Sequence, residues 1–286
     1  MAPTRLLPLI SIALFITACG GGSSGSNPNS EIGKMPATPE AENWLLVWSD
    51  EFDSDGLPDP TKWDYDVGGH GWGNQEEQYY TDSETKNARV ENGQLMITAI
   101  KETQAGNAYT SARLVSRNQG DWLYGRLEIR AKLPTGRGTW PAIWMLPTDW
   151  VYGDWPASGE IDIMEHVGYD QDKVHNSIHS SDFNHTKGTQ ITTSFMVDDA
   201  SNEFHDYAVE WRENRLDFYL DDVHTFTTAN SQSHPENGSS AWPFDARFHL
   251  LLNIAVGGTW GGNNGIDSNI WPQTMIVDYV RVYQAN

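Results

Sequence analysis

Cysteine and basic residues are both scarce in this chain of 286 residues. It contains one cysteine, which excludes a disulfide framework and a zinc site built from cysteines. Lysine and arginine together number 18 against 39 acidic residues, for a formal net charge of −21. A field of this sign repels a phosphate backbone, so it argues against a nucleic-acid partner. No apolar run reaches the roughly 18 residues that a membrane-spanning helix needs.

Aromatic residues are abundant by contrast. They make up 12% of the chain and include 13 tryptophans, and hydrophobic residues make up 38%. This composition is too apolar for a disordered chain and predicts a folded core. The length is typical of one large domain, because all-β sandwiches of this size commonly form a single domain.

The first residues form a targeting signal. Arg5 precedes an apolar run over 6–16, and Thr17 and Ala18 then lead to Cys19. A charged start, a short apolar stretch and small residues before a cleavage point are typical of a signal peptide. The ITAC segment resembles the lipobox of bacterial lipoproteins, in which the cysteine becomes the first mature residue and carries the lipid. We expect a signal peptide over 1–18 and lipidation of Cys19; an ordinary secretory signal is the alternative.

A Gly/Ser/Pro-rich segment follows the cysteine, and we interpret 19–42 as the lipidated residue and its flexible linker. A single domain is expected over 43–286. The protein is then exported and held at a bacterial outer membrane or cell surface, or otherwise secreted. Contact with a membrane is expected only through the lipid. Nothing in the sequence indicates an obligate partner, so a monomer is expected.

Alternation of apolar and polar residues dominates the rest of the chain. In WLYGRLEIRAKLP, apolar residues from Leu123 to Leu133 share one face and charged residues share the other. Further strands are predicted over 95–101, 111–116, 160–166, 189–196, 207–212, 216–220, 248–256 and 275–283. Gly, Asn and Asp clusters separate them, and no window has the pattern of an amphipathic helix. The fold class is therefore all-β, a sandwich or barrel.

Three acids interrupt one of these strands, in GEIDIMEHVG. Glu160 and Asp162 share a face of a regular strand, but Glu165 would point to the opposite face, into the core. An unpaired carboxylate is costly there. One extra residue at Ile163 or Met164, a β-bulge, would bring all three acids to one face, and bulges are common beside active sites.

Such a row of acids has a chemical use. In a retaining glycosidase, one carboxylate attacks the anomeric carbon while the other donates a proton and later activates water, with the two roughly 5–5.5 Å apart. Repulsion between the acids would keep Glu165 protonated while Glu160 stays ionised as the nucleophile, with Asp162 between them. Spacing alone equally allows a solvated acidic strand or a cation site.

The chain resembles glycoside hydrolase family 16, in the bulged form of the motif found in its laminarinases. The resemblance extends over LVWSDEFD, GWGNQEEQYYT, TSARLVS, GRLEIRAKLPTGRGTWPAIWMLP, FHDYAVEW, NIAVGGTWGG and VDYVRVYQ in addition to GEIDIMEHVG. It implies a β-jelly-roll sandwich of two antiparallel sheets with a concave substrate cleft. It also implies that Glu160 is the nucleophile, Asp162 the assisting acid and Glu165 the acid/base.

The resemblance further implies which residues contact the sugar. These are Asn74, Glu76, Arg113, Trp140, Trp144, His179 and Trp260. Indole rings suit the apolar faces of sugars, although core packing is the usual role of an individual tryptophan. Core positions are expected for Trp44, Trp48, Trp63 and Trp211. Glu76 could equally be an ordinary surface acid.

Metal sites receive less support. His175 and His179 share a face of a strand and His166 is near in sequence, but no third ligand has a recognisable spacing, which disfavours zinc. No cofactor is expected for catalysis. Members of the family often hold a structural Ca²⁺, and the positions matching its ligands are Glu51, Gly93 and Asp278, with oxygen ligands of the kind that Ca²⁺ prefers.

These observations predict a retaining endo-β-1,3-glucanase that acts on laminarin-type β-glucans. Mixed-linkage β-1,3-1,4-glucan or agarose as the main substrate remains an alternative. A further alternative is a carbohydrate-binding jelly roll without turnover, since sandwich folds host both functions.

Overall fold

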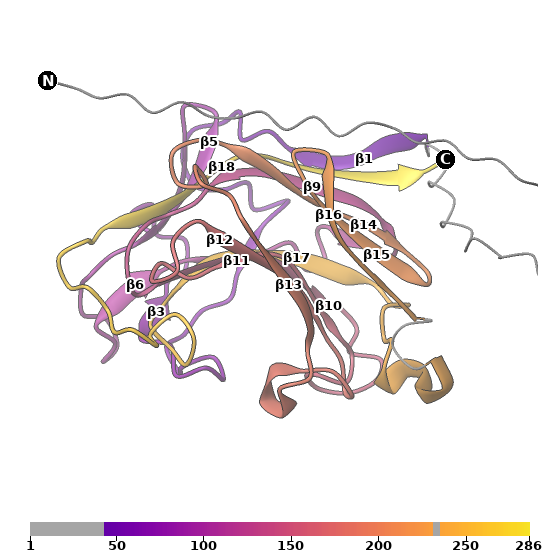
Figure 1. Cartoon of the computed structure of the whole chain (residues 1–286). Coiled ribbons are helices and arrows are strands. Elements are labelled where there is room, and N and C mark those ends of the chain that lie inside the picture. Colours follow the sequence, from indigo (N-terminus) through magenta and orange to yellow (C-terminus); the bar gives the residue numbers. More distant parts are fainter. Residues whose placement is uncertain (1–42, 231–234) are drawn as a thin grey trace, which may run out of the picture. The chain divides into compact units, whose positions relative to one another are not determined.

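The computed structural model describes residues 43–230 and 235–286, in which two curved antiparallel sheets lie face to face (Figure 1). The outer sheet has the order β16-β15-β14-β9-β18-β5-β4, and β1 also pairs with β18. Its strands are β1 (Trp44–Asp50), β4 (Ala88–Glu91), β5 (Gln94–Ala99), β9 (Gly125–Lys132), β14 (His205–Arg212), β15 (Arg215–Leu220), β16 (Val223–Ala229) and β18 (Gln273–Ala285).

The second sheet, here called the cleft sheet, has the order β13-β12-β11-β10-β17-β7-β2, and β8 also pairs with β17. Its strands are β2 (Asp64–Tyr65), β7 (Arg113–Val115), β8 (Asp121–Trp122), β10 (Thr139–Pro147), β11 (Glu160–His166), β12 (Lys173–His179), β13 (Ile191–Met196) and β17 (Phe248–Val256). A small parallel pair, β3 (Gln78–Tyr80) and β6 (Tyr109–Ser111), lies beside them. The predicted all-β sandwich is confirmed.

Within residues 43–230 and 235–286, helical structure is confined to short 3₁₀ turns, among them η1 (His185–Lys187) and η3 (Pro235–Ser240). None of the helical segments in the described ranges has the length and hydropathy that crossing a bilayer would require.

The core between the sheets follows from alternation. On β9, Leu127 and Ala131 are fully buried, as predicted. Leu123 was expected on the same buried face but is 38% exposed. The reason is local: Tyr124 has a φ of 63°, which turns the chain before β9 begins and ends the alternation there.

Among the longer strands β1, β10, β12 and β16 were not predicted, and neither were the short strands β2, β3 and β4. In β10 the prolines obscured the pattern, because proline normally argues against a central strand. Pro141 and Pro147 are nevertheless compatible with this strand, because β10 pairs with β11 only over 142–145 and both prolines lie outside that range. Of the tryptophans expected in the core, Trp63 and Trp211 are buried, whereas Trp44 is partly exposed.

Candidate active site

The three acids of β11 are brought to one face by a β-bulge. Glu160 pairs with His179 and Asp162 with Ser177 on β12, but Glu165 pairs with His175. The two residues between Asp162 and Glu165 therefore lie opposite a single residue of β12, Asn176. On the other side, Asp162 and Met164 pair with consecutive residues of β10, which leaves Ile163 unpaired. The bulge predicted at Ile163 or Met164 is present.

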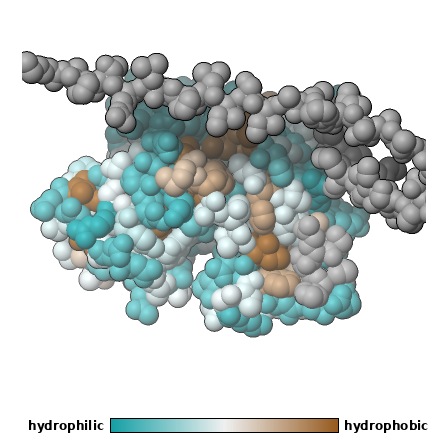
Figure 2. Space-filling view, in the orientation of Figure 1, coloured by the Kyte–Doolittle hydropathy of each residue, from teal (hydrophilic) through white to brown (hydrophobic). Residues whose placement is uncertain are grey.

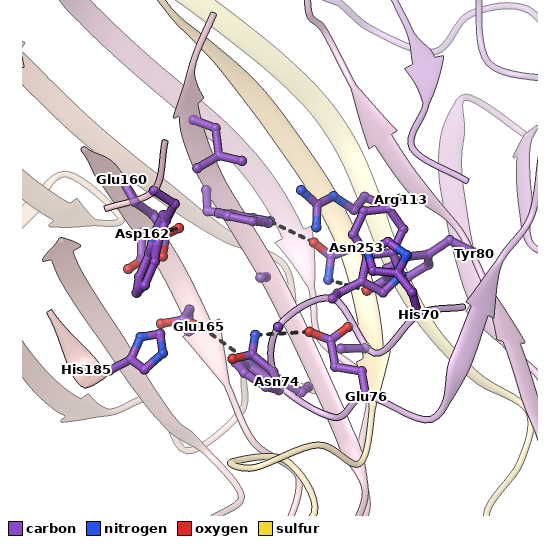
Figure 3. Close-up of a pocket in the computed structure, with 18 of the residues that line it drawn as sticks. His70, Asn74, Glu76, Tyr80, Arg113, Glu160, Asp162, Glu165, His185 and Asn253 are labelled. Carbon is purple, nitrogen blue, oxygen red and sulfur yellow. Dashed lines mark hydrogen bonds between the residues drawn. The ribbon is translucent and has the colours of Figure 1, made fainter. Parts of the chain in front are cut away.

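The same bulge keeps the apolar side chains of β11 in the core. Ile161, Ile163 and Met164 are at most 1% exposed, while Glu160 and Glu165 both line the cavity on the opposite face of the sheet. Figure 3 shows Glu160, Asp162 and Glu165 grouped at one end of this cavity.

Burial governs the electrostatics of the group. The side chain of Glu160 is 14% exposed and that of Asp162 is 2% exposed. Removal from water raises the pKa of each of the three acids to about 8, and the charge of Asp162 adds to the rise for both glutamates. In the described residues no lysine or arginine pairs with these carboxylates, and only His179 lies close enough to offset their charge.

Each glutamate receives one indole hydrogen bond. Trp155 Nε1 donates to Glu160 Oε2 at 2.9 Å, and Trp140 Nε1 donates to Glu165 Oε1 at 3.0 Å. These bonds leave the other oxygen of each carboxylate without an indole donor, and they lower the pKa of each glutamate against the effect of burial. Trp155 was not predicted as a site residue. Its proximity in sequence to Glu160 was the available signal.

The histidine of β12 lies within the acidic group. His179 Nε2 is 3.2 Å from Asp162 Oδ2 and 3.6 Å from Glu160 Oε1. The rings of His179 and of His185, in η1, both lie against Trp155. The three-histidine cluster considered from spacing does not form around His166, which is fully buried and accepts a hydrogen bond from the backbone N–H of Asp172.

The other end of the cavity is built on Arg113. Its guanidinium lies 4.7 Å from the ring centres of both Trp72 and Trp144, and its Nε lies 3.1 Å from Asp66 Oδ2. Trp144 Nε1 donates to Asn253 Oδ1 at 2.7 Å. Aromatic faces held rigidly by such partners suit the apolar faces of sugar rings.

Asn74 and Glu76 lie on the loop before β3 and also line the cavity. Asn74 Nδ2 and Gln78 Nε2 both donate to the carboxylate of Glu76, at 3.2 and 2.6 Å. Burial raises the pKa of Glu76, so this residue is not an ordinary surface acid. Figure 3 shows Asn74 and Glu76 facing the acidic group and the Arg113 end.

Tyr80, Asn253, Trp72 and His70 line the same cavity and were not predicted individually. Asn253 Nδ2 donates to the hydroxyl of Tyr80 at 3.0 Å. Three of the four lie inside motifs that carried the family resemblance, GWGNQEEQYYT and NIAVGGTWGG, and His70 lies just before them.

A second hollow continues the cavity beyond the acids. It is lined by His175, His179, Gln190 and Trp260 among others, and it shares Asn74, Trp140, Glu160, Glu165 and His185 with the first. Trp260 lies edge-on to Trp140, with ring centres 5.4 Å apart. The acids therefore lie between two parts of one cleft, and Figure 2 shows the surface hollowed between two lobes.

Two of the three predicted calcium ligands, Glu51 and Asp278, have partners within the protein. Arg281 donates two hydrogen bonds to the carboxylate of Glu51, at 3.0 and 2.8 Å. Asp278 accepts a hydrogen bond from Gln94 and lies 3.6 Å from Arg130 Nε. A cation at Glu51 would compete with Arg281 for the carboxylate, and calcium stays a prediction. The signal peptide, Cys19 and the linker lie outside the described residues.

Comparisons with known proteins agree with this geometry. The model of the family "Glycosyl hydrolases family 16" matches residues 75–281. A beta-glucanase of Rhodothermus marinus is 55% identical over 248 residues, which cover 86% of this chain and 87% of that protein. The X-ray structure of the laminarinase from Rhodothermus marinus matches with a TM-score of 0.84 at 54% identity, over 86% of this chain and 100% of that one.

A third relative has been solved with sugar bound. A mutant of SCLam, a non-specific endo-β-1,3(4)-glucanase, presents 1,3-β-D-cellobiosyl-glucose at its active site. It is 42% identical, with a TM-score of 0.80, over 85% of this chain and 95% of that one.

Proposed function

The chain belongs to glycosyl hydrolase family 16, and we propose that it is an endo-β-1,3-glucanase that cleaves laminarin-type β-glucans with retention of anomeric configuration. The bulge in β11 carries this proposal, because it directs Glu160 and Glu165 into one cleft, each with an indole donor. Catalysis requires no cofactor in this scheme.

The reaction proceeds in two displacements. In the first, the ionised carboxylate of Glu160 attacks the anomeric carbon while Glu165 gives its proton to the departing glycosidic oxygen. In the second, Glu165 removes a proton from water, which attacks the anomeric carbon and releases Glu160 as a carboxylate.

The two glutamates differ in their contacts. Burial and the neighbouring Asp162 raise the pKa of both, which favours the protonated form that an acid catalyst needs. His179 Nε2 lies 3.6 Å from Glu160 Oε1, and this close contact favours the ionised form of Glu160 as the nucleophile. When Glu160 becomes an ester its charge is lost, so the pKa of Glu165 falls and this residue can act as the base.

The form of the cleft supports internal cleavage. Aromatic side chains lie on both sides of the acids, with Trp72 and Trp144 in one part and Trp260 in the other. A chain that extends past the acids in both directions would be cut at an internal bond. This arrangement also weighs against the alternative of a binding module, since all three acids are in place.

Parallel digestion of laminarin, curdlan, lichenan, agarose and carrageenan with sizing of the products tests the proposal. We expect laminarin to yield a range of oligosaccharides early in the reaction, and Glu160→Ala to abolish cleavage while binding remains measurable. Proton NMR of the first products should show the β-anomer. Early α-anomer would contradict retention, and preferential cleavage of agarose would contradict the substrate.

Mixed-linkage glucan is a second candidate substrate. The structure of SCLam holds a sugar with both linkage types at its active site, and its fold matches this chain closely. Lichenan in the same panel decides between a β-1,3 specialist and an enzyme that accepts both linkages.

We also propose that the protein is exported as a monomeric lipoprotein anchored through Cys19. The ITAC segment followed by a Gly/Ser-rich stretch supports this proposal. Metabolic labelling with a clickable fatty acid should mark the protein but not its Cys19→Ser variant. Equal labelling of the two would rule out lipidation at this residue.

A further inference from the structure

Two carboxylates and one imidazole converge at the centre of the cleft. Glu160, Asp162 and His179 each offer one ligand atom, and these atoms lie within 4.8 Å of one another. Zn²⁺ binds histidine nitrogen and carboxylate oxygen at about 2.0–2.2 Å in a tetrahedron, so its ligand atoms lie roughly 3.3–3.5 Å apart. The observed separations from His179 Nε2 are 3.2 Å to Asp162 Oδ2 and 3.6 Å to Glu160 Oε1. Both fit the edges of such a tetrahedron.

A second observation points to a ligand at this place. Asp162 is 2% exposed, and its Oδ2 accepts no well-directed hydrogen bond in the described residues. The nearest donor atom to this oxygen is His179 Nε2, 3.2 Å away. A buried carboxylate oxygen without a well-directed donor is costly. A metal ion between the three side chains would satisfy it.

We propose that Glu160, Asp162 and His179 form an inhibitory binding site for Zn²⁺. An imidazole with two carboxylates suits Zn²⁺ better than Ca²⁺ or Mg²⁺, which prefer oxygen ligands alone. Three protein ligands leave the fourth position of the ion open to the cleft. Because the ion holds the carboxylate of Glu160, this oxygen is withdrawn from attack on the sugar, and the enzyme with bound Zn²⁺ is inactive.

Sequence spacing did not reveal this set, because His179 reaches the acids across a strand pair rather than along one strand.

The inhibition by Zn²⁺ rests on the proposed function, whereas the binding of Zn²⁺ does not. Titration calorimetry of the full chain with ZnCl₂ measures the binding without any glucan.

We expect one Zn²⁺ per chain. The His179→Gln variant should bind at least about tenfold more weakly, since even the residues that only support ligands contribute that much. His175→Gln is the matched control, because His175 lies on the same strand but outside this set, and its affinity should stay within about twofold of wild type. Asp162→Asn serves as a second variant should His179→Gln fold poorly. Addition of Co²⁺ should produce the intense visible absorption of a four-coordinate ion, and His179→Gln should abolish it.

Laminarin assays then test the consequence. Added ZnCl₂ should stop hydrolysis, EDTA should restore it, and CaCl₂ should have no such effect. No heat of binding with ZnCl₂, or equal binding by wild type and both ligand variants, would overturn the metal site while leaving laminarin cleavage unaffected. Zn²⁺ binding that requires His179, in a protein that cleaves no β-glucan, would support the metal site and contradict the proposed function.

Discussion

At the scale of single residues, two tryptophans hold the carboxylates of the two catalytic glutamates by hydrogen bonds. Trp155 and Trp140 each donate one hydrogen bond to a different glutamate. A hydrogen bond to a charged group contributes about 1.5–3 kcal/mol, enough to orient a carboxylate and to shift its pKa. In a plot of kcat/KM against pH, Trp155 should therefore affect the acidic limb through the nucleophile Glu160. Trp140 should affect the alkaline limb through the acid Glu165.

The first prediction separates these two effects. Trp155→Phe removes a donor to Glu160, so the pKa of Glu160 should rise and the acidic limb of kcat/KM should move to higher pH. Trp140→Phe should raise the pKa of Glu165 and move the alkaline limb to higher pH. Each variant should lose about tenfold or more in kcat. Measurement of kcat/KM against pH checks both, and unchanged limbs would show that the indoles only contact sugar.

The second prediction concerns the stability that the folded protein loses because these acids are buried. Between the unfolded pKa of about 4 to 4.5 and the folded value of about 8, the folded group of Glu160, Asp162 and Glu165 holds protons that the unfolded chain has released. The unfolded state binds fewer protons there, so the free energy of unfolding falls as pH rises through this window.

A neutral amide in place of Glu160 removes this penalty. Glu160→Gln should match the wild type in stability at about pH 4 and exceed it increasingly toward about pH 8, by about 1.4 kcal/mol for each unit of pKa elevation relieved. Urea denaturation at several pH values measures the difference. The exposed Glu203 provides the control, since Glu203→Gln should change nothing. Equal stability of Glu160→Gln and wild type at pH 8 would contradict the electrostatic account.

At the scale of elements, the entry into β11 positions the nucleophile. Gly159 directly precedes Glu160 and has a φ of 90°, a conformation that residues with a side chain rarely adopt. A Cβ at this position would lie 3.0 Å from atoms of Phe244 and of Pro243. The strand can therefore begin in this direction only if the residue before it is glycine.

The third prediction isolates the crowding at Gly159 from its backbone strain. Gly153 has a comparable φ of 105°, but a Cβ there meets nothing closer than 3.9 Å. Gly159→Ala should destabilise the protein by about 1–3 kcal/mol more than Gly153→Ala and should lower kcat as Glu160 shifts. Thermal denaturation and laminarin assays of both variants provide the comparison. Equal losses would mean that strain alone matters.

At the scale of the whole molecule, the charge of −21 bears on the choice of substrate. A neutral glucan meets no Coulomb barrier on approaching an acidic protein, whereas an anionic polysaccharide does. Salt should screen the effect of this net charge on association.

The fourth prediction follows from this screening. For laminarin, KM should stay within about twofold between about 10 mM and about 500 mM NaCl. For a carboxymethylated β-1,3-glucan, KM should be high at low salt and fall as salt is added. Steady-state kinetics on both substrates test this, and a KM for the anionic glucan that rises with salt would indicate a positively charged binding surface instead.

Much of the molecule follows from the sequence alone. Alternation predicts the all-β class, whereas the two-sheet sandwich was implied by the family resemblance. The bounds of β11 and β17 agree with the ranges expected from the sequence, because both strands are bounded by glycines or loops. The bulge could be predicted because Glu165 would otherwise be buried among apolar residues, a conflict that is entirely local to β11. Roles for the three acids and the sugar contacts came from the family resemblance.

Only the tertiary structure decided which side chains meet. Arg113 lies between Trp72 and Trp144, and His179 lies against Asp162, although the residues are far apart in the chain or on different strands. Leu123 was expected to be buried but is 38% exposed, and Arg281 donates hydrogen bonds to the carboxylate of a predicted calcium ligand, Glu51. The physical reason is the same in each case. Periodicity reports the face on which a side chain lies, whereas the neighbour that it contacts depends on strand pairing and loop paths over long separations, which local sequence does not encode.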